Sequence, residues 1–199
     1  MAITRARTSS VAQGPSTKKT LLGGNDVILG GSYEAIGTAN GTGSSNTITF
    51  TSIPGTYKHL QIRGIVKSTT SGSSFSGVLF TVNSDSSNSY TRHIVWGDGT
   101  TAYAYGASAS VAWSIGGNDL PSAGYTNIFG AHVIDILDYA NTNKNKTARA
   151  LTGCDVNGAG EILLSSTVYI KTNAITSIQL VSASGNFNQY TQYSLYGIK

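Results

Sequence analysis

The chain has 199 residues, of which only 11% are charged, and its formal net charge is +4. A chain of this length fits one sizeable domain, and its 24 glycines, with many Ser, Thr and Asn residues, disfavour helices. Hydrophobic residues make up 39% of the chain, which is enough for a core and excludes a wholly disordered protein.

The N-terminal segment, residues 1–22, carries Arg5, Arg7, Lys18 and Lys19 with no acidic residue beside them. We expect an extended N-terminal arm here, continued to residue 32 by a glycine-rich join. Because the segment is mostly Ser, Thr, Ala and Gly and not a dense basic block, we expect it to bind an acidic protein surface and not nucleic acid.

No apolar run follows these cations as it would in a signal peptide, and no stretch approaches the roughly 20 apolar residues of a membrane helix. We therefore expect synthesis in the cytoplasm and no membrane partner.

From residue 33 to residue 199, short apolar runs alternate with turns rich in Gly, Asn and Ser. In residues 59–66, Leu60, Ile62 and Val66 fall on one face of a strand, and His59 and Arg63 on the other. The expected strands are 47–53, 59–66, 77–82, 92–97, 110–115, 127–139, 147–153, 161–171, 175–181 and 192–199. This pattern predicts one all-β domain, 33–199, built as an antiparallel, jelly-roll-like β-sandwich.

The polar sequence NTNKNK, residues 141–146, separates two of the strongest predicted strands. It is typical of a hairpin connection, and we expect Asp135 and Asp138 on the first strand to face Lys146 or Arg149 on the second.

The residues that usually carry catalysis are scattered. His59, His93 and His132 fall in separate strands without metal-ligand spacing, and we expect each to be exposed or hydrogen-bonded. Four acids, Asp85, Asp98, Asp119 and Asp155, fall in predicted turns, where Asp bonds to its own backbone. No nucleophile elbow or phosphate-binding loop is present, and the only cysteine, Cys154, excludes a disulfide framework. We therefore predict no catalytic residues, no metal site and no cofactor.

Tyrosines are concentrated in residues 101–106, where Tyr103 and Tyr105 are the candidates for surface recognition. Aromatic rings on a sandwich stack on sugars, fill the core or pack between subunits. The sequence leaves these alternatives open.

Three stretches taken together resemble a class of bacteriophage virion proteins common in marine and cyanobacterial phages. They are YEAIGTANGTGSSNTITFTSIPGTYKHLQIRGI, VIDILDYANTNKNKTARALTG and the terminal YSLYGIK, and the resemblance covers residues 33–199. It implies a structural component of a phage particle with a jelly-roll-like sandwich, and it implies no catalytic residues. The class includes tail-fibre and decoration proteins.

We therefore expect a non-enzymatic virion protein on the particle surface, held to other virion proteins by its arm. It would be a capsid decoration or cement protein, or a tail-fibre protein, and we expect a homo-oligomer, with a trimer favoured because open sheet edges invite pairing. One alternative is a lectin-like module that binds host surface glycans. A further alternative is a polysaccharide depolymerase.

Overall fold

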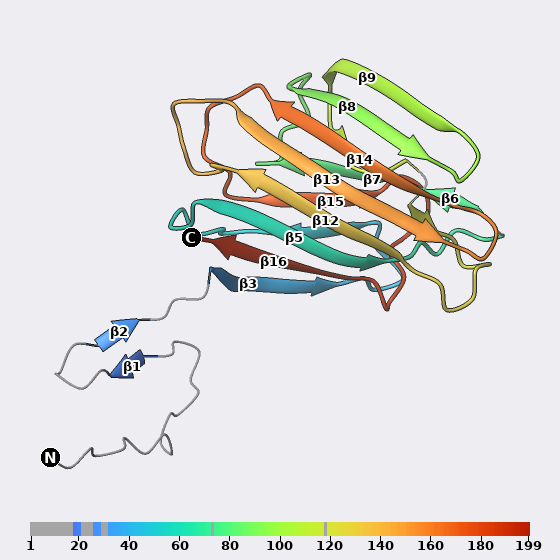
Figure 1. The fold of residues 1–199 in the computed structure, drawn as a ribbon, viewed down its shortest axis with the longest axis horizontal. Coiled ribbons are helices and arrows are strands. Elements are labelled where there is room, and N and C mark those ends of the chain that lie inside the picture. The colour runs from blue at the N-terminus through green and yellow to red at the C-terminus, as the bar shows by residue number, and fades with distance from the viewer. Residues whose placement is uncertain (1–17, 21–25, 29–31, 73, 118) are drawn as a thin grey trace, which may run out of the picture.

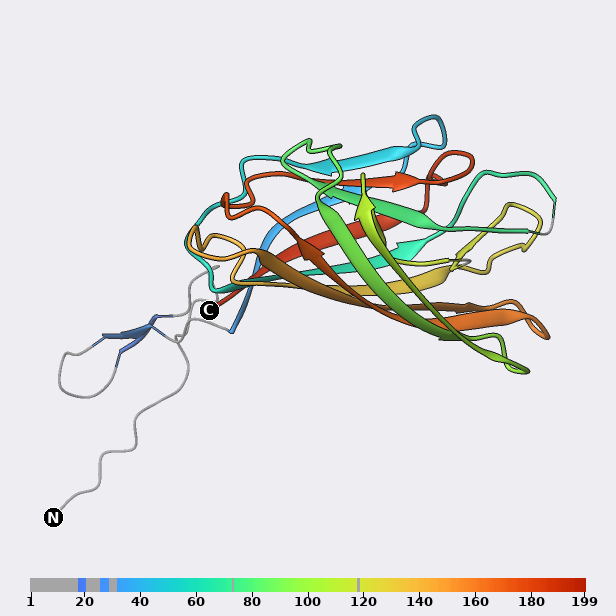
Figure 2. The same ribbon diagram turned by 90° about the horizontal axis from the view of Figure 1, so that it is seen from above.

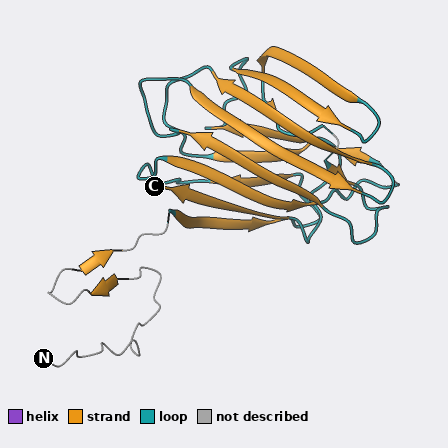
Figure 3. Cartoon of the chain, viewed as in Figure 1, coloured by secondary structure: helices purple, strands orange, loops and turns teal. Residues whose placement is uncertain are grey.

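The computed structural model describes residues 18–20, 26–28, 32–72, 74–117 and 119–199. Every element of this described part is a β-strand (Figures 1 and 3), so it contains no helix able to cross a membrane.

The larger sheet has eight antiparallel strands in the order β3-β16-β5-β12-β13-β14-β8-β9 (Figure 1). Their bounds in this order are Tyr33–Asn40, Gln192–Ile198, His59–Val66, Gly130–Leu137, Lys146–Asp155, Gly160–Tyr169, Tyr90–Gly97 and Ala102–Ser110. The strand at the C-terminus, β16, is therefore an interior strand that pairs with β3 on one side and β5 on the other.

The smaller sheet has four strands in the order β10-β7-β15-β4 and lies over the larger one (Figure 2). Its strands are Trp113–Ser114, Val78–Val82, Ile178–Ser182 and Thr47–Phe50. Two short ribbons complete the described structure: β6 (Phe75–Ser76) with β11 (Leu120–Pro121), and β1 (Lys18–Thr20) with β2 (Asp26–Ile28).

The apolar core fills the space between the two sheets. Alternate side chains of each strand point inward, because successive residues of a strand face opposite sides. The larger sheet contributes Leu60, Ile62, Ile134, Ile136 and Leu195, and the smaller sheet contributes Ile48, Phe80, Val82, Ile178 and Leu180. Each such burial contributes about 1.5–3 kcal/mol relative to exposure, so the core holds both sheets together.

The structure confirms the all-β antiparallel sandwich, and the jelly-roll connection stays a prediction. Strand β5 coincides with residues 59–66. The hairpin between β12 and β13 is also confirmed, and Asp135 accepts a 3.1 Å hydrogen bond from Arg149 Nε across it. Lys146 does not face an acid: it is 2% exposed, and its ammonium donates to the carbonyls of Asn141, Lys144 and Thr172.

Two long strands, β3 and β9, are absent from the strands expected from the sequence. No side chain of either strand is fully buried. Their sequences, YEAIGTAN and AYAYGASAS, also lack the regular alternation of apolar and polar residues that indicates a half-buried strand. Pairing with β16 and β8, respectively, makes them strands.

Candidate functional site

Tyr103 and Tyr105 lie on one face of β9, the edge strand of the larger sheet. Tyr103 pairs in register with Trp96 of β8, and Tyr105 with Ile94. This is the face on which Tyr90 of β8 enters the core, yet Tyr103 is 40% exposed and Tyr105 51% exposed. The structure thus brings the two sequence-predicted tyrosines together at an open sheet edge.

The ring of Tyr103 stacks on the indole of Trp96, with 4.9 Å between ring centroids and an interplanar angle of 16°. Beside it, the guanidinium of Arg92 lies 5.5 Å from the centroid of Tyr105. Three aromatic rings and a cation therefore form a strip along β8 and β9. Sequence reasoning missed Trp96 and Arg92, because only the strand register places them against the tyrosines.

The carboxylate of Asp98 lies at the end of this strip, in the turn between β8 and β9. It accepts hydrogen bonds from the backbone and hydroxyl of Thr100, the backbone of Thr101 and the hydroxyl of Tyr103. These bonds, with that from the Thr100 hydroxyl the strongest influence, hold the pKa of Asp98 well below its ordinary value. An ionised acceptor beside stacked rings is an arrangement suited to the hydroxyls and flat face of a sugar.

Only part of the predicted N-terminal arm lies within the described residues. Arg5 and Arg7 lie outside the described residues. Lys18 and Lys19 lie in β1, where their backbones pair with Ile28 and Val27 of β2.

A second group of functional side chains is buried in the core. His132 Nε2 lies 3.0 Å from Asp119 Oδ2, both side chains are fully buried, and the Tyr193 hydroxyl lies 2.8 Å from His132 Nδ1. The prediction that Asp119 serves its own turn is wrong, because its carboxylate faces His132 instead. The prediction of a hydrogen-bonded His132 is confirmed. These side chains have no exposed surface, so they cannot meet a substrate in this structure.

Other candidate chemistry is also accounted for within the described residues. No group of three or more His, Cys, Asp and Glu side chains there could hold a metal ion. Burial is the main influence that raises the pKa of the Cys154 thiol to about 11, so Cys154 is not a thiolate nucleophile at neutral pH. The turn role of Asp85, Asp98 and Asp155 is confirmed, since each accepts a backbone hydrogen bond from a residue two positions later.

The outer face of the larger sheet, the side turned away from the core, carries an apolar surface. Six side chains on it, between 36% and 63% exposed, are Ile65, Val95, Val133, Leu151, Ile162 and Leu164. Together they expose on the order of 600 Å², the upper end of what monomeric proteins show.

The strand register arranges this surface in two rows across β12, β13, β14 and β8. The bulky row consists of Val133, Leu151, Leu164 and Val95. The recessed row, two residues away on each strand, consists of the small residues Ala131, Gly153 and Gly97, and it is interrupted on β14 by the exposed side chain of Ile162.

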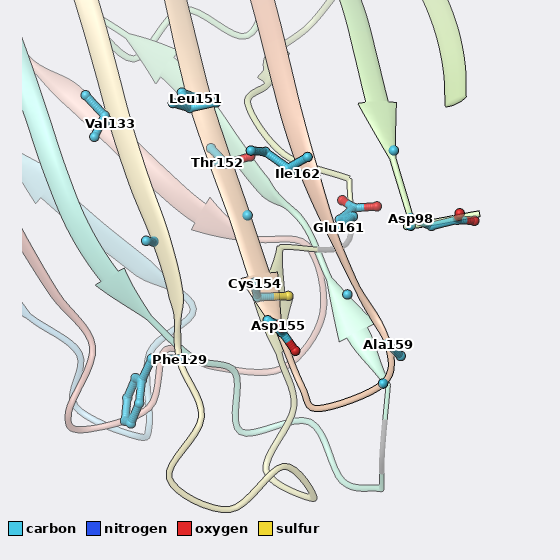
Figure 4. A pocket seen from close by; sticks show the side chains of 16 residues that line it. Asp98, Phe129, Val133, Leu151, Thr152, Cys154, Asp155, Ala159, Glu161 and Ile162 are labelled. Carbon is cyan, nitrogen blue, oxygen red and sulfur yellow. The ribbon is translucent and has the colours of Figure 1, made fainter. Parts of the chain in front are cut away.

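The recessed row lines a depression of about 850 Å³, which also reaches Val133 and Leu151 of the bulky row (Figure 4). No single strand reveals the two rows, since each contributes one residue to each row.

Comparison of the chain with protein-family models, with curated proteins and with solved structures gives no significant match in any of the three.

Proposed function

We propose that the protein is a non-enzymatic structural component of a bacteriophage particle, held to other virion proteins by residues 1–32. The sandwich of residues 33–199 then faces outward from the particle surface. It serves as a capsid decoration or cement protein, or as part of a tail fibre. The sequence resemblance to virion proteins motivates the proposal.

The observation that carries the proposal is the apolar outer face of the larger sheet. An exposed apolar patch at the upper end of the monomer range is often a binding surface, and the subunits of an assembly need such surfaces. The arm supports the same role, because Arg5, Arg7, Lys18 and Lys19 offer an acidic neighbour four cations close together in sequence.

Co-sedimentation with phage particles stripped of this protein tests the proposal. Full-length protein is compared with a form lacking residues 1–25, and heads and tails are tested separately. We expect only the full-length protein to bind. Binding to heads identifies a decoration protein, and binding to tails identifies a fibre component.

A charge variant of the full chain tests the arm without shortening it. We expect replacement of Arg5, Arg7, Lys18 and Lys19 by Gln to weaken sedimentation with the particle. The matched control replaces Lys58 and Lys144, two exposed cations of the body, and should bind normally. Equal binding of the truncated form would refute the anchoring role, and no binding to either heads or tails would refute the virion role.

A lectin-like role is the second candidate, and the stacked pair of Trp96 and Tyr103 beside Asp98 favours it. Aromatic faces with adjacent polar groups are suited to bind sugars. Host surface glycans are therefore the ligand class that this strip fits.

A glycan array with the full-length protein tests this candidate. We expect binding that Tyr103→Ala and Tyr105→Ala each abolish, while Tyr190→Ala, at a tyrosine that is 69% exposed, leaves it intact. An array without signal, or binding that survives both substitutions in β9, would contradict a glycan site at this edge.

A further inference from the structure

The outer face of the larger sheet has a shape that is complementary to itself. The bulky row and the recessed row are separated by one inward-facing residue on each strand, which on β13 is Thr152. Consider a two-fold axis that lies in the interface and runs across the strands at the level of Thr152. It places the bulky row of one molecule over the recessed row of a second molecule. Each strand then lies antiparallel over its own copy in a second molecule.

This operation places large side chains over small ones. Leu151 comes to lie over the partner's Gly153, and the same holds for Val133 over the partner's Ala131 and for Val95 over the partner's Gly97. On β14, Leu164 meets the partner's Ile162 in an apolar contact. An axis along the strands would instead place the bulky row on itself, so the side chains support the first axis alone.

The charges beside the rows fit the same axis. Arg149 and Asp155 are exposed on β13 at equal distances along the strand from Thr152, on opposite sides of it. The two-fold that brings Leu151 over Gly153 therefore also brings Arg149 of one molecule next to Asp155 of the other. Opposite charges at a rim fix the orientation of a complex and suppress alternatives.

We propose that the outer face of the larger sheet binds a second copy of this chain and forms a two-fold dimer by face-to-face sheet packing. Aligned sheets pack in this way in β-sandwiches. The apolar rows with their charged rim approach the roughly 800 Å² per partner that stable interfaces bury. This dimer is an alternative to the trimer favoured by the sequence, and it is independent of whether the arm binds a phage particle.

Sedimentation equilibrium of the full-length protein over a range of concentrations tests the proposal. We expect a species of twice 20.7 kDa that Leu151→Glu and Leu164→Glu each convert to monomer. Because both side chains are exposed in the single chain, the variants should keep the circular dichroism spectrum of the wild type. Ile170→Glu, at a residue that is 50% exposed, directly follows the end of β14 and lies outside both rows, is the control and should remain dimeric.

Further variants distinguish rows that pack against each other specifically from a surface that associates only through its apolar area. Ala131→Leu fills the recessed row and should weaken the dimer by about tenfold, since overpacking of a fitted contact is costly. If the molecules associated only through apolar area, the same change would strengthen their association. Arg149→Asp and Asp155→Arg should each weaken the dimer, and the double variant should restore it.

A wild-type protein that stays monomeric or forms a trimer would overturn the proposal. So would a dimer that survives Leu151→Glu, or one that Ala131→Leu strengthens. Particle binding is measured separately, so failure of the dimer would leave the virion role standing, and failure of particle binding would leave the dimer.

Discussion

Asp85 connects the turn after β7 to the end of β14 through its carboxylate. It accepts hydrogen bonds from the backbone and hydroxyl of Ser87 at 2.9 and 2.5 Å and from the hydroxyl of Tyr169 at 2.7 Å. Lys171 Nζ lies 2.7 Å from the same carboxylate. Burial alone would raise the pKa of Asp85, but these partners outweigh it and hold the pKa well below its ordinary value of 3.8.

We expect Asp85→Asn to lower the free energy of unfolding by about 1–3 kcal/mol near neutral pH, because charge-assisted hydrogen bonds are lost. A depressed carboxyl pKa gives stability that is present above the unfolded value of 3.8 and is lost as the pH falls through the folded value. Urea unfolding from about pH 6 to about pH 2 should therefore show the difference from wild type shrinking at the acid end.

The control for Asp85 is Glu34→Gln, which removes an exposed ion pair with Lys199. Exposed pairs contribute little, so this variant should unfold nearly as the wild type does. A difference for Asp85→Asn that stays constant down to the acid end would contradict the assignment.

Tyr193 is buried and meets His132 at Nδ1. With the imidazole proton on Nε2, the Tyr193 hydroxyl donates to Nδ1 and Nε2–H faces Asp119, which gives each buried ring nitrogen a polar neighbour.

We expect Tyr193→Phe to lower the free energy of unfolding by about 1–3 kcal/mol, because Nδ1 of His132 loses its partner without gaining water. Tyr196→Phe, three residues along the same strand and on the outer face, is the matched control and should have a small effect. Equal losses for the two variants in urea unfolding would argue against a role of the buried hydroxyl.

At the scale of the element, β5 and β16 approach closely because β5 has a glycine where Tyr193 packs. A Cβ at Gly64 would lie 2.3 Å from Cε1 of Tyr193, a separation that the buried ring cannot relieve by turning away. A Cβ at Gly37 in β3 would meet nothing within 4 Å.

We expect Gly64→Ala to lower the free energy of unfolding by about 1–3 kcal/mol, the typical cost of overpacking. Gly37→Ala should leave it unchanged or raise it by up to about 1 kcal/mol, since Ala restricts the unfolded chain. Urea midpoints of the two single variants give the comparison. A neutral Gly64→Ala would mean that the two strands pack less closely at this point.

The elements that the sequence predicts well are those with one buried face. Strand β5 was placed to the residue because Leu60, Ile62 and Val66 alternate with polar neighbours. The sequence AYAYGASAS of β9 has no such alternation and its strand state comes from pairing with β8, so local pattern could not find it.

The candidate site was predicted only in part, for a related reason. Tyr103 and Tyr105 stand out by composition alone, whereas Trp96 becomes their neighbour through the register of β8 and β9. Asp119, just before β11, meets His132 of β12, and no local sequence pattern records a contact between distant segments.

At the scale of the whole molecule, buried tyrosines tie both sheets to the core. Tyr90 donates its hydroxyl hydrogen to the backbone carbonyl of Asp85 and accepts from the backbone of Val82, while Tyr139 donates to the carbonyl of Pro54. Burial is the leading cause that raises the pKa of Tyr90 to about 12 and the pKa of Tyr139 above its ordinary 10.0. Burial likewise leads the causes that raise the pKa of Tyr169 and Tyr193.

A raised tyrosine pKa gives stability that is fully present below the unfolded value of 10.0 and is lost as the pH rises through the folded values. Burial lowers the pKa of Lys67 and Lys146. By itself, this would make the folded state more stable as the pH rises towards 10.5, but the tyrosines with a raised pKa are more numerous. We therefore expect cooperative alkaline unfolding in which part of the tyrosinate absorbance near 295 nm appears only as the β-sheet circular dichroism disappears. In denaturing urea, all the tyrosines should titrate together near 10.0. If all the tyrosinate absorbance instead developed while the circular dichroism was unchanged, the four hydroxyls would have to be exposed to water, and this packing of the two sheets would be wrong.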